Sequence, residues 1–318
     1  MLNFTRYVPQ THYRQVAELW ERVFPARYAV TDRVLRPRIA TRANLAPSDA
    51  LVGLIAGQVM AFGAVECWPE VNAPPYYGSI QAVLVASEWQ QRGVGQRLLG
   101  ELEQRLRELG CRQARVSYGT YRFWSGVPTD LQSAIRLFQS AGYLSRGEVV
   151  DLLAPLEHGP NLKENHHVLP DEAEVAPATV GDLGMLRLWL GNQSSVWLNQ
   201  LSLLASSGDL SNVLLLRHKG QLVGCVQTFT PGSQFRGANL VWERDYGEQM
   251  GGLGAVFVLD KFRGQGLGRY LVHAAAEHVR NCGGHSLFID WVDPRFASFY
   301  RPLGAMECNN GVKFSKSL

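Results

Sequence analysis

Cysteine is sparse in this chain: five residues are scattered over 318 positions, and no two of them form a C-x-x-C pair. An odd, dispersed set of this kind is unlike a disulfide framework or a cysteine zinc site, so it favours reduced thiols. The chain also lacks a signal peptide and a run of about 18 apolar residues. We therefore expect a cytoplasmic protein with no membrane partner.

Charge of one sign is not in excess either. Lys and Arg number 31 against 28 Asp and Glu, the net charge is +3, and no basic run resembles a tail. This composition predicts no nucleic-acid partner. The adjacent histidines His166 and His167 have no third ligand nearby in the sequence, so we also expect no metal site.

Two related glycine-rich phrases are the most informative feature of the sequence. Gln90-Gln91-Arg92-Gly93-Val94-Gly95 and Arg263-Gly264-Gln265-Gly266-Leu267-Gly268 each follow a short apolar run and open an amphipathic helical pattern. A strand, a glycine-rich turn and a helix can hold an anion, because the first amides of the helix lack internal partners and glycine permits close approach. The P-loop and the dinucleotide fingerprint are both excluded, since the lysine of the first and the third glycine of the second are missing.

The two phrases belong to an internal duplication. Gly93 and Gly266 are 173 residues apart, and the strand residues Val83 and Val256 keep the same offset. Each half shows the pattern β-α-(α)-β-β-β-α-β-α-β, which predicts an α/β fold with two similar domains. We place the domains at 1–156 and 172–318 with a polar linker at 157–171. Segment 149–153 is expected to close the first sheet, and segment 311–315 the second.

The spacing Gln/Arg-x-x-Gly-x-Gly between strand and helix resembles the pyrophosphate loop of the GNAT (GCN5-related) N-acetyltransferases, and the order of elements matches that superfamily across nearly the whole chain. The resemblance implies a tandem two-domain member, each domain a mixed central sheet flanked by helices, with acetyl-CoA as acyl donor and no metal. In this family the central strand bulges and splays from its neighbour, and its free backbone pairs with the pantetheine arm. The implied coenzyme A-binding residues are Val83, Val85, Val256 and Val258 on the strands, and Gln91, Arg92, Gly93, Val94, Gly95, Gln96, Arg97, Gly264, Gln265, Gly266, Leu267, Gly268 and Arg269 in the loops.

Acyl transfer from a thioester to an amine needs a neutral amine, a stabilised oxyanion and a protonated thiolate. The resemblance implies a tyrosine on the helix after the fifth strand as the acid, and Tyr300 stands there in the second half, whereas the first half has Phe138. The alternative for Tyr300 is a packed aromatic with a hydrogen-bonded hydroxyl. Glu66 and Asp290 are candidates for the base, with capping or solvent-facing roles as the alternative.

Three functions remain open on this basis. The first is direct acetyl transfer to a primary amine of a small molecule. The others are a non-catalytic acyl-CoA sensor or scaffold in one or both domains, and a protein amine acetyltransferase. The acceptor and the oligomeric state are not predicted. The aromatic stretch 118–124 suggests an acceptor wall or inter-domain packing, Trp89 and Phe262 suggest core or lid residues, and Cys67 and Cys225 suggest small buried apolar residues.

Overall fold

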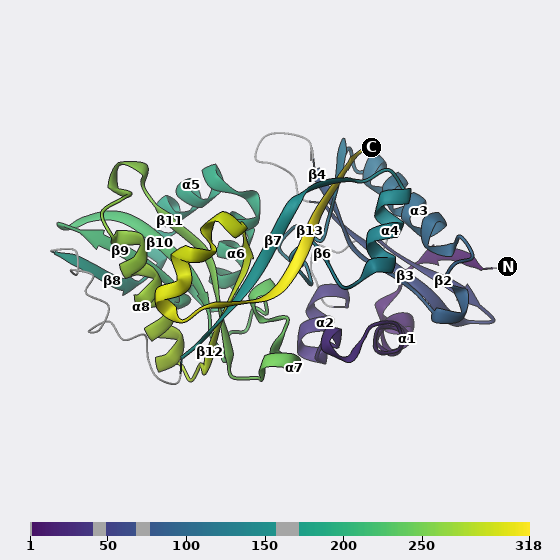
Figure 1. Ribbon diagram of the computed structural model, residues 1–318, viewed down its shortest axis with the longest axis horizontal. Helices are drawn as coiled ribbons and strands as arrows, with labels where there is room; N and C mark the ends of the chain where they lie inside the picture. The colour runs from purple at the N-terminus through teal and green to yellow at the C-terminus, as the bar shows by residue number, and fades with distance from the viewer. Residues whose placement is uncertain (1, 41–48, 68–76, 157–171) are drawn as a thin grey trace. The chain divides into compact units, whose positions relative to one another are not determined.

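The computed structural model describes residues 2–40, 49–67, 77–156 and 172–318 (Figure 1). The chain divides into two compact units. Unit 1 comprises Met1–Val149 with Asn310–Leu318, and unit 2 comprises Val150–Asn309. The predicted linker 157–171, with His166 and His167, lies outside the described residues.

Unit 1 is a mixed sheet with helices on both faces. Its strand order is β1-β2-β3-β4-β5-β13, and β4 with β5 is the parallel pair in an otherwise antiparallel arrangement. Helices α3 and α4 lie on the opposite side of the sheet from α1 and α2 (Figure 1). The elements are β1 (Asn3–Arg6), α1 (Pro9–Val23), α2 (Asp32–Ile39), β2 (Ala50–Ile55), β3 (Gln58–Cys67), β4 (Tyr77–Val85), α3 (Val94–Glu108), β5 (Gln113–Val116), β6 (Val127–Pro128), α4 (Gln132–Ser140), the start of β7 (Leu144–Pro155) and the end of β13 (Met306–Ser317).

Unit 2 repeats this plan with the strand order β7-β12-β11-β10-β9-β8, and β11 with β12 is its parallel pair. Beside the rest of β7 and the start of β13, its elements are β8 (Ala173–Pro177), α5 (Leu183–Gln193), α6 (Ser195–Ser206), β9 (Val213–His218), β10 (Gln221–Phe229), α7 (Glu243–Tyr246), β11 (Met250–Val258), α8 (Leu267–Asn281), β12 (Ser286–Val292) and a 3₁₀ helix, η8 (Pro294–Leu303). The predicted α/β fold of two similar GNAT-like units is confirmed.

Local sequence accounts for the shared plan. Leu98, Leu99, Leu102 and Leu106 recur at helical spacing, and all four are at most 1% exposed where α3 covers the sheet. Each β-hairpin turns through two left-handed residues, Ala56-Gly57 in unit 1 and Lys219-Gly220 in unit 2, as a two-residue turn requires.

The last strands of the two units are exchanged, which corrects the sequence-based assignment. Strand β7 enters unit 2 at Val150 and pairs there with β12, with Leu152 opposite Ile289. The end of β13 belongs to unit 1, where Ser315 lies opposite Arg115 on β5. Segment 311–315 alternates apolar and polar residues, whereas segment 149–153 is apolar except for Asp151. Each pattern predicts a strand without naming the sheet that receives it.

The exchanged end of β13 is well anchored in unit 1. Phe314 is 3% exposed and belongs to the core cluster that α3 covers. Two residues further along the same face of the strand, Lys316 Nζ contacts both carboxylate oxygens of Glu103 on α3 at 2.8 Å. The core of unit 1 is therefore completed by the last nine residues of the chain.

Candidate active site

In each unit the hydrogen-bonded ladder between the two parallel strands ends partway along their length, and we call the place where the strands part the V. In unit 1, β4 pairs with β5 from Tyr77 to Ile80, and Ser117 N donates to Ile80 O at 2.9 Å as the final rung. In unit 2, β11 pairs with β12 from Met250 to Leu253. Within the described ranges, neither β4 nor β11 has a strand partner on that side beyond these points.

The strands that carry the predicted pantetheine-binding backbone also contain bulges. The β3–β4 register shifts at Gln81, and the β10–β11 register shifts across residues 254 and 255. Such bulges bend a strand and increase its twist, which separates it from its neighbour. Val83, Val85, Val256 and Val258 lie beyond the points where the parallel pairing ends, and they keep their antiparallel partners on β3 and β10. Their role in receiving pantetheine stays a prediction.

One residue per unit ties the loop to the end of the strand, and neither was among the residues predicted for the site. Gln90 Nε2 donates to Val85 O at 2.9 Å, and Arg263 Nε donates to Val258 O at 3.1 Å. These are the first positions of the two glycine-rich phrases. Each has a long side chain that ends in an N–H donor, and this shared feature could have indicated a hydrogen bond to the strand. They hold the loop against the strand that it follows.

The glycine-rich loops have a backbone suited to an anion. Gly93 is the N-cap of α3 at φ 76°, and Gly266 is the N-cap of α8 at φ 79°. Apart from the adjacent backbone, none of the residues that the structure describes has an atom within 4 Å of the position that a Cβ would take on either glycine. Two places upstream, Gln91 and Gly264 are also left-handed, at φ 56° and 78°. Alternation of left- and right-handed residues turns successive amides toward one point, a known anion-binding arrangement.

The other predicted loop residues fall into two groups. Val94 and Leu267 are buried in the two cores, so that only their backbone can face a ligand. The side chains of Gln91, Arg92, Gln96, Arg97, Gln265 and Arg269 are exposed. Gly95 and Gly268 lie inside the helices, where a Cβ would meet Leu137 or Phe299 at an ordinary 3.5 Å. Trp89 and Phe262 pack against the cores, as expected of core residues.

Tyr300 and Asp290 are neighbours in unit 2. Tyr300 lies on η8, half-buried, with its ring centroid 4.9 Å from that of Phe299. Burial and the negative charge of Asp290 raise the pKa of Tyr300 to about 12. The phenol is therefore protonated at neutral pH and is a weaker acid than free tyrosine, whose pKa is about 10.

Asn239 connects the two sides of the V in unit 2. Its Nδ2 donates to Leu253 O on β11 at 2.8 Å and to Asp290 Oδ1 on β12. The side chain is completely buried. Its position on the loop between β10 and β11 (residues 230–249) gave no sequence signal, because that segment has no periodicity.

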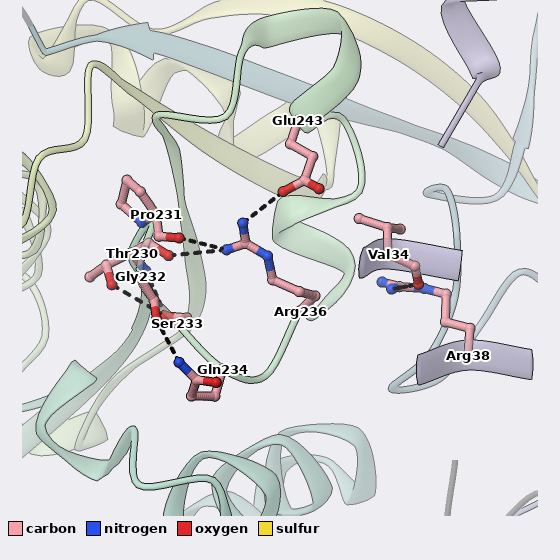
Figure 2. Close-up of polar contacts among 9 residues, drawn as sticks. All are labelled: Val34, Arg38, Thr230, Pro231, Gly232, Ser233, Gln234, Arg236 and Glu243. Atoms are coloured by element: carbon pink, nitrogen blue, oxygen red, sulfur yellow. Dashed lines mark hydrogen bonds and ion pairs between the residues drawn. The ribbon is translucent and has the colours of Figure 1, made fainter. Parts of the chain in front are cut away.

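A buried ion pair fixes the same loop. Arg236 Nη2 lies 2.7 Å from Glu243 Oε2, and the two side chains are 4% and 0% exposed. Figure 2 shows the guanidinium of Arg236 between this carboxylate and the carbonyls of Thr230 and Pro231. Residues 235–243 are all buried, so this loop is a packed part of unit 2.

The corresponding position in unit 1 has a different set of side chains. Phe138 is 5% exposed and packs with its ring centroid 5.2 Å from Tyr143 and 6.1 Å from Phe314. Leu137 faces Gly95 as Phe299 faces Gly268, which supports the alignment of Phe138 with Tyr300. Here the candidate acid is replaced by a core residue.

Glu66 is enclosed in a hydrogen-bond network of unit 1. It is 5% exposed, and its Oε2 accepts from Gln81 Nε2 at 2.7 Å and from Tyr121 N at 3.4 Å. Gln81 Nε2 also donates to Tyr118 O at 2.6 Å. Both hydrogens of the Gln81 amide are therefore used in holding the mouth of this V.

The aromatic stretch 118–124 packs inside unit 1. Trp20 of α1 lies 4.4 Å from Phe123 and 5.7 Å from Trp124, measured between ring centroids. The guanidinium carbon of Arg38 lies 5.4 Å from the centroid of Phe123, and Arg38 Nη1 donates to Val34 O at 2.8 Å (Figure 2). These contacts give the stretch a role in the core of its own unit.

Comparison with known proteins identifies the family. The acetyltransferase (GNAT) family matches residues 13–143 and 185–305, once in each unit. The chain therefore belongs to this family, as an acetyltransferase with two GNAT units in tandem. The fold and loops in each unit are those of a protein class that uses acetyl-CoA. A search of curated proteins gave no match.

Solved structures share the fold along the full length. A GCN5-related glucosamine N-acetyltransferase region of a fungal multi-domain GH3 β-N-acetylglucosaminidase superimposes with a TM-score of 0.86 at 20% identity, covering 99% of this chain and 38% of that longer one. A GCN5-related N-acetyltransferase from Sphaerobacter thermophilus gives 0.72 at 17% identity, covering 99% and 95%. A tandem GNAT protein from the clavulanic acid biosynthesis pathway gives 0.68 at 13%, covering 100% and 98%.

Proposed function

We propose that this acetyltransferase moves the acetyl group of acetyl-CoA directly to a primary amine of a small molecule, and that the reaction takes place in unit 2. The observation that carries the proposal is that the phenol of Tyr300 lies near enough to Asp290 for that charge to raise its pKa, whereas unit 1 has Phe138 in the core at the corresponding place.

The edge of each central strand that lacks its parallel neighbour suits the coenzyme. Val83, Val85, Val256 and Val258 lie on strand segments that have lost their parallel neighbour, and an extended pantetheine arm pairs with such backbone. Open space at Gly93 and Gly266 suits a pyrophosphate. The coenzyme supplies an activated thioester, so no covalent enzyme intermediate is required.

Asp290 and Tyr300 have complementary roles in this proposal. Asp290 accepts the proton that the amine loses as nitrogen bonds to the acetyl carbon, and Asn239 orients the carboxylate. Tyr300 donates a hydrogen bond to the sulfur as the carbon–sulfur bond breaks. With a pKa of about 12, the phenol keeps its proton in the resting enzyme.

A small acceptor is favoured over a peptide by the loop at residues 230–249. Residues 238–240 of this loop pack on β11 and β12, with Asn239 Cβ only 2.3 Å from where a Cβ on Gly252 would lie. A protein substrate needs an open groove beside these strands, and in unit 2 this stretch of the sheet is covered by packed chain.

Release of the coenzyme A thiol from acetyl-CoA, measured with separate panels of amino sugars, aminoglycosides, polyamines and lysine peptides, tests the proposal. We expect turnover with a small amine and none with peptides. Turnover with peptides alone would establish protein acetylation instead. Calorimetric binding of coenzyme A with no turnover on any amine would support the non-catalytic sensor, for which Phe138 already argues in unit 1.

An Asp290→Asn variant tests the base, with Glu66→Gln as its matched control in unit 1. We expect a fall in kcat of about 10²–10⁴-fold for the first and unchanged kcat per folded molecule for the second. Equal losses in both would show that unit 1 also carries chemistry.

A further inference from the structure

Two of the five cysteines lie together in unit 1. The Sγ atoms of Cys67 and Cys111 are 3.2 Å apart, although 44 residues separate them in the sequence. Cys67 ends β3 and is half-buried, whereas Cys111 precedes β5 and is 4% exposed. By contrast, Cys225 is fully buried within β10 of unit 2.

Gly78 on the intervening strand makes this contact possible. Cys67 lies opposite Gly78 in the β3–β4 register, and Gly78 lies opposite Ala114 in the β4–β5 register. A Cβ on Gly78 would lie 2.9 Å from Cys111 Sγ, which is closer than a carbon and a sulfur can pack. The absence of a side chain at this position lets the two sulfurs meet over the middle strand.

We propose that Cys67 and Cys111 are a modification site, a dithiol that a low-molecular-weight disulfide such as oxidised glutathione converts to an intrachain disulfide. The sulfurs must approach from 3.2 Å to the bond length of about 2.0 Å. This inference is independent of acetyl transfer.

The exchange proceeds in two balanced steps. Cys67, the more accessible thiol, attacks one sulfur of the external disulfide, breaks its S–S bond and releases one thiol, which carries the Cys67 proton. Cys111 then attacks the Cys67 sulfur of the mixed disulfide and releases the second thiol with the second proton. The protein loses two electrons and two protons, and the oxidant gains them.

Accessibility, and not the local electrostatics, selects Cys67 for the first attack. The hydrogen bond from Cys67 lowers the pKa of Cys111, while that hydrogen bond and burial raise the pKa of Cys67. In the reduced pair the thiolate therefore forms preferentially on Cys111, the less accessible sulfur.

The bond would tie the end of β3 to the residue before β5. It would lie at the start of β4, whereas Val83 and Val85 are at the end of that strand. It closes a loop of 44 residues and restricts the unfolded chain, so oxidation should raise the melting temperature of unit 1 by on the order of 5–10 °C.

The full-length protein, equilibrated with reduced or oxidised glutathione and then alkylated, tests the site. We expect five free thiols to become three, and mass spectrometry to find peptide 108–112, released by trypsin, joined to the peptide that contains Cys67. Five persistent thiols, or a cross-link between other cysteines, would overturn the proposal.

Variants separate the pair from the remaining thiols. Cys67→Ala should abolish both the cross-link and the rise in melting temperature, and Cys282→Ala, at an exposed position on unit 2, should retain both. Should Cys111→Ala fail to fold, Cys67→Ala decides alone, because a cross-link that survives in that variant contradicts the assignment.

Discussion

The two units share a scaffold and differ at the mouth of the V. Both have a bulged central strand, a left-handed N-cap glycine and a Gln or Arg that ties the loop to the strand. A buried carboxamide spans each mouth, Gln81 on the strand itself in unit 1 and Asn239 from a loop in unit 2. Asn239 donates to the carboxylate of Asp290, which lies near the phenol of Tyr300. Gln81 donates to the carboxylate of Glu66, which also accepts from a backbone amide.

The two units therefore share their backbone scaffold and glycine-rich loops, and they differ in the side chains at the mouth of the V. The elements common to both units are made by backbone conformation and by short-range bonds. The elements that differ are single side chains, which can be exchanged without loss of the scaffold.

The largest effect is expected at Tyr300, where unit 1 has Phe138. Tyr300→Phe should lower kcat by about 10²–10⁴-fold and leave coenzyme A affinity nearly unchanged, because only the transition state loses a contact. Phe138→Leu, the matched change in unit 1, should lower stability and leave kcat unaltered. A Tyr300→Phe enzyme with full kcat would remove the main support for chemistry in unit 2.

Next in size is a test of the strand exchange. Phe314→Ala lies in the second half of the sequence but should destabilise unit 1, by about 3–5 kcal/mol. Leu152→Ala lies in the first half but should destabilise unit 2, by about 2–5 kcal/mol. Hydrogen exchange read by mass spectrometry assigns each loss to a unit. The opposite assignment would mean that each half keeps its own last strand.

Glycine substitutions test whether both loops bind the coenzyme. Gly93→Val and Gly266→Val introduce left-handed strain of about 1–2 kcal/mol and fill the open space, so each should weaken its coenzyme A site by roughly 10–100-fold, or about 1.4–2.8 kcal/mol. Gly110→Val and Gly283→Val carry the same strain at the other ends of the two helices, at φ 86°.

Calorimetric titration of these variants gives the answer. The controls should lose stability and keep affinity for coenzyme A. If all four variants bind as the parent does, the loops do not hold the pyrophosphate. If the parent protein itself binds only one coenzyme A molecule per chain, binding belongs to a single unit.

The smallest effect concerns pH. The pKa of Tyr300 is raised from 10.0 to about 12 in the folded chain, so its contribution to stability is fully present below about pH 10 and is lost as the pH rises toward 12. The stability difference between the parent and Tyr300→Phe should therefore change only above about pH 10, measured by urea unfolding. A change centred near neutral pH would contradict this environment for Tyr300. Phe138→Leu should show no such dependence.

Much of the fold was predictable because its signals are local. The leucine stripe of α3, the glycine turns of the hairpins and the two anion loops each depend on neighbouring residues. The constant offset of 173 residues between Gly93 and Gly266 then predicted that the units would be alike. The order of elements, with Tyr300 four residues before Gly304 and Phe138 four residues before Gly142, led to these two residues as counterparts.

Tertiary structure decided the features that join distant segments. Exchange of β7 and β13 depends on which sheet offers a partner, and a strand pattern carries no such information. Asn239 reaches Asp290 across 51 residues, and Cys67 meets Cys111 across 44. The raised pKa of Tyr300 likewise comes from burial and from a charge that the fold brings near. The sequence by itself determined the two scaffolds and their glycine loops, because backbone conformation follows local composition; the side chains at each V were brought together only by long-range packing.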